Sequence, residues 1–76
     1  MKTITVYGAQ GCMPCKSLTK ALAEKNVPYR YIELDENYTG EISSVPTTVI
    51  EEDGKEVARI VGFNTAKIIE IYHGGN

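Results

Sequence analysis

The two cysteines of the chain lie close together, in the segment Cys12-Met13-Pro14-Cys15. They directly follow a β-prone run at residues 3–7 and directly precede a run with helical periodicity. A C-x-x-C at such a junction is typical of a dithiol that cycles with its disulfide. The motif therefore predicts that a strand enters a helix here and that Cys12 and Cys15 form a redox centre.

The position of Cys12 at the start of the expected helix makes it the attacking thiol. Unpaired N–H groups and the helix dipole favour a negative charge at a helix N-terminus, and such positions lower the pKa of cysteine. Cys15 lies three residues on, on the same helix face, where it can resolve a mixed disulfide. Tyr7 and Lys16 are assigned auxiliary roles beside the thiolate, against the plainer alternatives of a packed strand residue and a solvated lysine.

Length, charge and cysteine number limit the functions open to this chain. Its 76 residues predict one small domain over 1–76 with a thin core. The net charge of −2 shows no basic stripe, which argues against nucleic acid as a partner. No apolar run reaches the roughly 18 residues of a membrane span, and no secretory-signal pattern opens the sequence. Two cysteines are too few for a secreted disulfide scaffold, so we expect a thiol protein of the reducing cytoplasm. We also expect a monomer.

Hydrophobic periodicity predicts four strands and two helices in the order β-α-β-(loop)-β-β-α. The expected strands are 3–7, 29–34, 47–51 and 55–61, and the expected helices are 15–25 and the segment after Asn64. A β-α-β unit gives a parallel pair, and Asp53-Gly54 signals an antiparallel hairpin. The sequence therefore predicts an α/β fold with a four-stranded mixed sheet and both helices on one face.

Local signals limit the first helix and the segment before it. Gly8-Ala9-Gln10-Gly11 is expected to end the first strand. Pro14 suits the first helical turn, and Asn26 is the expected C-cap.

The last helix has its own signals. Asn64 is its expected N-cap. Its inward face is assigned to Ala66, Ile69 and Tyr72, and its end to Gly74-Gly75.

Three motifs together resemble the thioredoxin superfamily. They are Tyr7-Gly8 ahead of the C-x-x-C, then Val45-Pro46-Thr47, then Val61-Gly62-Phe63-Asn64. The size and short N-terminus are similar to those of glutaredoxins and of NrdH-redoxins, which donate electrons to ribonucleotide reductase. The resemblance implies a thioredoxin-like fold of the glutaredoxin type. It also implies a thiol-disulfide oxidoreductase that reduces protein disulfides, with ribonucleotide reductase as a candidate target.

The resemblance assigns Pro46 to the catalytic site. Val45-Pro46 matches the position where the superfamily keeps a cis proline facing the dithiol. The backbone of Val45 could then pair with an extended peptide or with glutathione. A trans proline that starts an edge strand is the alternative from the residues alone.

The resemblance also implies further substrate-binding residues around the dithiol. Gly62-Phe63-Asn64 resembles the segment that borders the groove in these families, where N–H groups at a helix start can hold a carboxylate. A strand end followed by a helix cap is the alternative. Met13 and Pro14, between the cysteines, complete the expected set.

Residues 35–44 depart from the family. Glutaredoxins usually have another helix there, whereas this polar stretch lacks a helical period and predicts a loop or one helical turn, so that the second helix is shortened or absent. Strand alternation assigns one sheet face to Ile4, Val6, Ile32 and Leu34 and the other to Thr3, Thr5, Tyr7, Tyr29 and Tyr31. We expect the Tyr/Thr face to be partly shielded by the loop, around Tyr38 and Ile42.

The electron source departs from the family as well. Glutathione-using glutaredoxins resemble each other in an acidic pair that grips the glutathione amine, where this chain has the uncharged Asn64-Thr65. Pro14 directly precedes the second cysteine, as in thioredoxins. Both features favour a flavoprotein of the thioredoxin-reductase type as the donor. A glutathione-dependent glutaredoxin is the alternative.

Two alternatives come from other classes of protein. Soft-metal carriers for copper also place C-x-x-C after a first strand, but they generally have Met where this chain has Gln10, and they end on a strand. A partner-binding domain with a vestigial dithiol is the other. For the cysteine pair itself, a static disulfide and a shared zinc site remain, although zinc needs about four ligands and the one histidine is His73. We expect no metal and no cofactor other than the Cys12–Cys15 disulfide.

Overall fold

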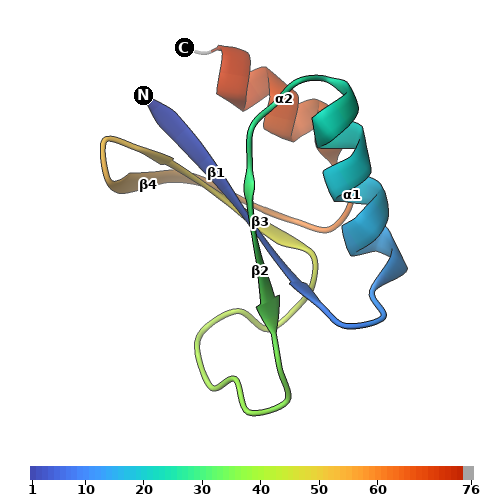
Figure 1. Cartoon of the computed structure of the whole chain (residues 1–76). Helices are drawn as coiled ribbons and strands as arrows, with labels where there is room; N and C mark the ends of the chain where they lie inside the picture. Colours follow the sequence, from blue (N-terminus) through green and yellow to red (C-terminus); the bar gives the residue numbers. More distant parts are fainter. Residues whose placement is uncertain (75–76) are drawn as a thin grey trace.

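The computed structural model describes residues 1–74 as a four-stranded mixed sheet with two helices (Figure 1). The elements are β1 (Lys2–Ala9), α1 (Met13–Glu24), β2 (Arg30–Leu34), β3 (Thr47–Glu52), β4 (Lys55–Val61) and α2 (Thr65–His73). The sheet order is β2-β1-β3-β4, in which β1 and β2 are parallel and the other two pairs antiparallel. This arrangement confirms the predicted fold. Gly74 is the C-cap of α2, and Gly75, the other half of the predicted helix end, lies outside the described residues.

Both helices pack on one face of the sheet. Their buried side chains form a single cluster with those of the strands, made up of Ile4, Val6, Leu18, Leu22, Val27, Ile50, Ile60 and Ile68. Full burial of one such side chain stabilises the fold by about 1.5–3 kcal/mol. The cluster combines residues from both ends of the chain, and it fixes α1 and α2 relative to β1.

The first strand runs two residues further than predicted. Gly8 was expected to break it, yet Gly8 is buried within β1 and pairs with Glu33 of β2. The ring of Tyr31 fills the space beside it, since a Cβ on Gly8 would lie 2.7 Å from Tyr31 Cζ. The turn toward α1 is made instead at Gly11, whose φ of 80° suits glycine.

The face assignment of β2 was wrong. In the parallel register Val6 lies opposite Tyr31 and Tyr7 opposite Ile32, and opposed residues point to the same face. Tyr31 therefore lies on the helix-covered face, while Ile32 and Leu34 lie on the other. Burial, and to a lesser extent Glu33, raise the pKa of Tyr31 above its ordinary value.

The inward face of α2 also differs from the prediction. Ala66 is exposed, whereas Ile68 is fully buried and makes the main core contact. Ile69 and Tyr72, both predicted, pack against the core together with Ile71. The core-facing side of the helix is thus centred on Ile68.

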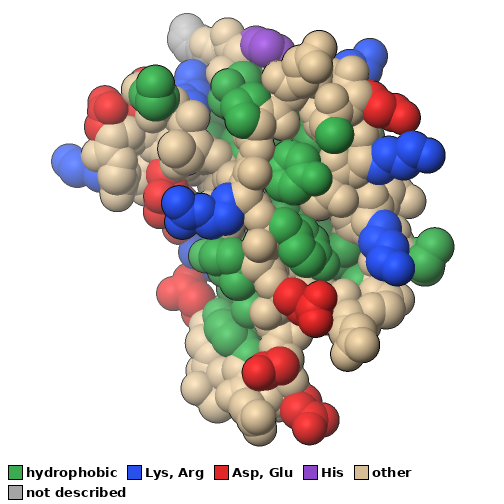
Figure 2. All heavy atoms as spheres, in the orientation of Figure 1, with side chains coloured by type: hydrophobic (Ala, Val, Ile, Leu, Met, Phe, Trp, Pro, Cys, Tyr) green, Lys and Arg blue, Asp and Glu red, His purple; other side chains and the backbone are tan. Residues whose placement is uncertain are grey.

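The edge strand β2 leaves apolar surface open. Tyr29 and Tyr31 are 38% and 39% exposed, and Figure 2 shows apolar side chains gathered between β2 and α1.

No helix in residues 1–74 has the length and apolar character needed to span a membrane.

Residues 35–44 form a loop without a regular helix, as predicted. The hydroxyl of Tyr38 accepts a hydrogen bond from Ile42 N at 3.0 Å. The loop lies on the sheet face opposite the helices, where Ser44 O accepts a hydrogen bond from Thr47 Oγ1 and Thr47 is 2% exposed.

The hairpin between β3 and β4 turns at Asp53-Gly54. Both residues have positive φ, 54° and 87°, as a type I′ turn requires. The N-terminal amine of Met1 lies 3.3 Å from Asp53 Oδ1, so the start of β1 lies beside this turn.

The end of α1 is closed by a Schellman motif. Lys25 is the C-cap, so the predicted cap Asn26 stands one position later, with a φ of 59°. Asn26 N donates to Ala23 O at 3.0 Å, and Val27 N donates to Leu22 O at 2.9 Å. Val27 and Leu22 also meet in the core, so this turn joins the helix end to the hydrophobic cluster.

The turn at Asn26 provides the first test. Because a Cβ is disfavoured at positive φ, the free energy of unfolding of Asn26→Ala should be about 1 kcal/mol lower than that of Asn26→Gly, as measured by urea titration. The two variants are each other's control, since both lose the amide side chain. Equal free energies of unfolding would show that the left-handed backbone at this position is not what limits the substitution.

Candidate active site

The two cysteines form a disulfide at the N-terminus of α1, with their Cα atoms 5.3 Å apart. Cys12 is the N-cap, with extended backbone, and its Sγ accepts a hydrogen bond from Cys15 N at 3.2 Å. Cys12 N in turn donates to Ala9 O at the end of β1. The strand-to-helix junction predicted from the sequence therefore holds the dithiol in place.

The two sulfurs have different surroundings. Cys12 is half-buried at the surface, whereas Cys15 is fully buried against the core. The first turn of α1 carries no acidic residue and has Pro14 near its start, as expected. An anion on Cys12 would thus meet the positive end of the helix dipole without a competing carboxylate from that turn.

The Val45–Pro46 peptide bond is cis, which confirms the geometry expected from the resemblance. Pro46 is buried, and its carbonyl accepts a hydrogen bond from Gly62 N at 2.8 Å. Thr47, the next residue, pairs with Tyr7 of β1. The structure therefore places Val45, Pro46 and Gly62 at the end of the sheet where β1 leaves for Cys12.

The segment after β4 borders the same end of the sheet. Gly62 has a φ of 94°, a conformation that glycine adopts without strain. Asn64 is the N-cap of α2, and its Oδ1 accepts from Lys67 N at 3.2 Å. The strand end and helix cap inferred from the residues alone are thus both present.

Apolar side chains are exposed in the segments of the site. Met13, Val61 and Phe63 are 66%, 62% and 55% exposed. Met13 and Phe63 were predicted from the sequence as substrate-binding residues. Val61 was not. Its exposure could have been expected, because it is the last residue of β4 and the residue before it, Ile60, is buried in the core.

The two auxiliary residues lie as their sequence positions suggest. Tyr7 is half-buried in β1, and the side chain of Lys16 is exposed on α1. Lys16 N donates to Cys12 O as part of the helix. Their roles beside the thiolate stay predictions. In the part of the chain that the structure describes, no three His, Cys, Asp or Glu side chains gather as metal ligands would.

Comparison with known proteins adds two kinds of relative. Residues 4–65 match the family model of glutaredoxin. The chain is 37% identical to a thioredoxin of Chlamydia pneumoniae over 72 residues, which cover 83% of this chain and 71% of that protein. It is 33% identical to thioredoxin-1 of Saccharomyces cerevisiae over 71 residues, 82% of this chain and 69% of the relative.

Solved structures agree on the fold. Thioredoxin of Fasciola hepatica superposes with a TM-score of 0.63 at 28% identity, covering 90% of this chain and 74% of that one. The short form of thioredoxin f from spinach chloroplast gives 0.66 at 24% identity, over 90% and 70% of the two chains.

Unequal reactivity of the two thiols is the prediction that follows from this geometry. In the reduced protein at neutral pH, Cys12 should be alkylated at least about tenfold faster than Cys15, because Cys12 is accessible at a helix N-terminus and Cys15 is buried. Timed iodoacetamide labelling with peptide mass spectrometry measures both rates. Cys12→Ser and Cys15→Ser, each with one thiol left, serve as controls. Equal slow labelling of both thiols would contradict an activated thiolate at Cys12.

Proposed function

The chain belongs to the glutaredoxin family within the thioredoxin superfamily and is a protein-disulfide oxidoreductase, and we propose that a flavoprotein of the thioredoxin-reductase type reduces its disulfide after each cycle. The observation that carries the activity is the Cys12–Cys15 disulfide at the N-terminus of α1.

The reaction proceeds by two exchanges of sulfur bonds. The Cys12 thiolate attacks one sulfur of a substrate disulfide, forms a mixed disulfide and releases the other substrate sulfur as a thiolate, which takes up a proton. Cys15 then loses its proton and attacks Cys12 Sγ, so that the Cys12–Cys15 disulfide forms and the second substrate thiol leaves. Two electrons have passed to the substrate, and two electrons from the donor restore the dithiol. The dithiol carries both electrons, so we propose that no metal or other cofactor takes part.

An extended segment of the protein substrate would bind along Val45. This residue lies outside β3, and within residues 1–74 its backbone has no hydrogen-bond partner. It can therefore pair with an incoming strand. The exposed side chains of Met13 and Phe63 offer apolar contact to the same substrate.

The choice of donor rests on the start of α2. Asn64 and Thr65 occupy the place where glutathione-using relatives carry an acidic pair, and the side chain of Asn64 is already engaged in capping the helix. An ammonium group of glutathione would meet no carboxylate from these two residues. Pro14 before the second cysteine supports the same choice.

The target and compartment follow from the partial resemblance. Val61-Gly62-Phe63-Asn64 shares part of the corresponding segment of NrdH-redoxins, which supports ribonucleotide reductase as a target. A dithiol that must return to its reduced form supports the cytoplasm as its compartment. We propose that it acts there as a monomer.

Glutathione as donor is the second candidate, favoured by the match of residues 4–65 to the glutaredoxin family. An assay that supplies the two donors separately distinguishes the two candidates.

The donor is tested by NADPH oxidation coupled to insulin reduction, with this protein as the sole carrier. One arm contains thioredoxin reductase, and the other contains glutathione with glutathione reductase. We expect turnover to be much faster in the first arm than in the second, and absent from both arms with Cys12→Ser. Turnover only with glutathione would overturn the proposed donor. If neither donor supports turnover while the dithiol is intact, the soft-metal alternative is favoured, and Cu(I) titration tests it directly.

A substitution at the start of α2 tests the reason for this preference. Thr65→Asp places a carboxylate where the glutathione amine is expected, so glutathione-coupled turnover should rise about two- to fivefold, as for an exposed ion pair. Ala66→Asp, exposed one residue further along α2, is the matched control and should give no such rise. A Thr65→Asp rate equal to that of the control would show that this position does not select the donor.

A further inference from the structure

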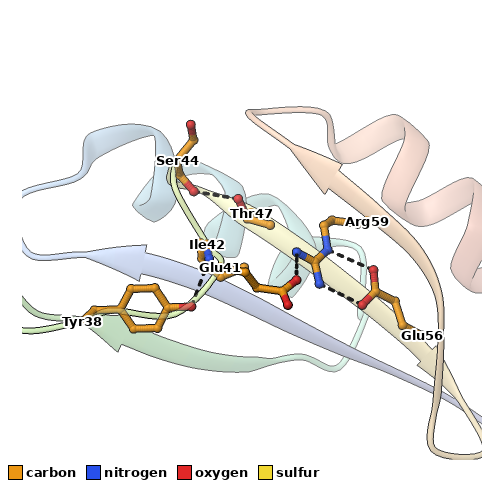
Figure 3. Close-up of polar contacts among 7 residues, drawn as sticks. All are labelled: Tyr38, Glu41, Ile42, Ser44, Thr47, Glu56 and Arg59. Atoms are coloured by element: carbon orange, nitrogen blue, oxygen red, sulfur yellow. Dashed lines mark hydrogen bonds and ion pairs between the residues drawn. The ribbon is translucent and has the colours of Figure 1, made fainter.

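Arg59 links β4 to the loop of residues 35–44 on the sheet face opposite the helices (Figure 3). Its Nε and Nη2 each donate to one carboxylate oxygen of Glu56 at 2.9 Å. Its Nη1 lies 2.8 Å from Glu41 Oε1. Glu56 therefore holds the guanidinium in one orientation, in which Nη1 faces Glu41 of the loop.

The pKa values of Glu56 and Arg59 are both shifted toward the charged forms, which favours the ion pairs of Arg59. The hydrogen bond from Arg59 lowers the pKa of Glu56, and the Arg59 pKa is raised by its bonds to Glu56 and then Glu41. The Arg59 side chain is 33% exposed, against 78% for Glu41. The guanidinium is thus the anchored partner, and the Glu41 side chain is the one that is held.

The loop has few other attachments between Tyr38 and β3. The bond from Ile42 N to the Tyr38 hydroxyl stays within the loop. Thr47 Oγ1 donates to Ser44 O at 2.6 Å, at the start of β3. Among the described residues, the pair with Arg59 is the only ion pair that this loop makes.

Packing does not fix the loop by itself. A cavity of about 110 Å³ lies between residues 41–44 and the side chains of Thr47, Arg59 and Val61. Since no side chain fills this space, the ion pair with Arg59 is a contact that would oppose a shift of the segment. Because Val45 and Pro46 follow directly, such a shift would reach the substrate groove.

We propose that Arg59 is a positioning residue: through Glu41 it holds residues 41–44 against β4 and so fixes the Val45–Pro46 segment on which a protein substrate binds. The inference rests on the proposed function, because it concerns the groove used by that substrate. Arg59 bonds to neither cysteine, so its removal changes substrate binding and leaves thiol reactivity unchanged.

The test compares two variants that break the same ion pair from either side. Arg59→Met keeps an unbranched stem of similar bulk, and Glu41→Gln changes one exposed carboxylate. Glu70→Gln, which breaks the Lys67–Glu70 pair on α2, is the matched control. KM and kcat are measured with insulin and with a small aromatic disulfide, using whichever donor supports turnover.

Both variants should raise the KM for insulin about two- to fivefold, the range of an exposed ion pair. The double variant should show no further rise over Arg59→Met, since Glu41 has no ion-pair partner left once Arg59 is replaced. The kcat, the rate with the small disulfide and the pH profile of Cys12 alkylation should match those of the unmodified protein, as should all values for Glu70→Gln. An unchanged KM, additive effects, a shifted alkylation profile or an equal rise in the control would each overturn the proposal.

Amide hydrogen exchange gives a reading that needs no turnover. The Ile42 amide should exchange about two- to fivefold faster in Arg59→Met and in Glu41→Gln, but not in Glu70→Gln, because its bond to Tyr38 opens more often when the loop is released. If the unmodified protein reduces insulin with neither donor, the proposed function fails, and the exchange rates still decide the positioning role. Unchanged exchange at Ile42 would overturn it.

Discussion

The antiparallel pairing of β1 with β3 is the constraint on which the site depends. β1 ends at Ala9 and continues directly to Cys12, while β3 begins at Thr47 opposite Tyr7. Because the strands run in opposite directions, the beginning of one lies beside the end of the other. The segment before β3 is thereby delivered to the loop that holds the dithiol, and β4, antiparallel again, returns Gly62 to the same end.

Most of the architecture could be predicted from the sequence because its signals are local. Alternating β-branched residues, Pro14 at a helix start and Asp53-Gly54 between two strands each fix the backbone over a few residues. The errors arose where a local pattern has two solutions. Alternation in β2 does not say which set of residues shares a face with Val6, and only the register with β1 decides this. Ala66 and Ile68 likewise compete for the inward side of a short helix.

The site was predictable to different depths. The C-x-x-C at a strand-to-helix junction is enough to predict which thiol attacks and which resolves, and the structure confirms the junction and the disulfide. The cis bond before Pro46 was expected only from the resemblance, since the residues alone allow either isomer. The pair of Arg59 with Glu41 could not be predicted. It joins two surface side chains far apart in the sequence, across a loop whose path no periodicity specifies.

The hairpin of β3 and β4 has the candidate site at its open end and a tight turn at its closed end. Its open end carries Pro46 and Gly62, while its closed end carries the Asp53-Gly54 turn beside Met1. Strands of this length span about 17–20 Å. A tether, label or inserted peptide at the turn would thus stand clear of an incoming disulfide, which makes this turn the natural point for immobilising the carrier on an electrode or fusing it to a client.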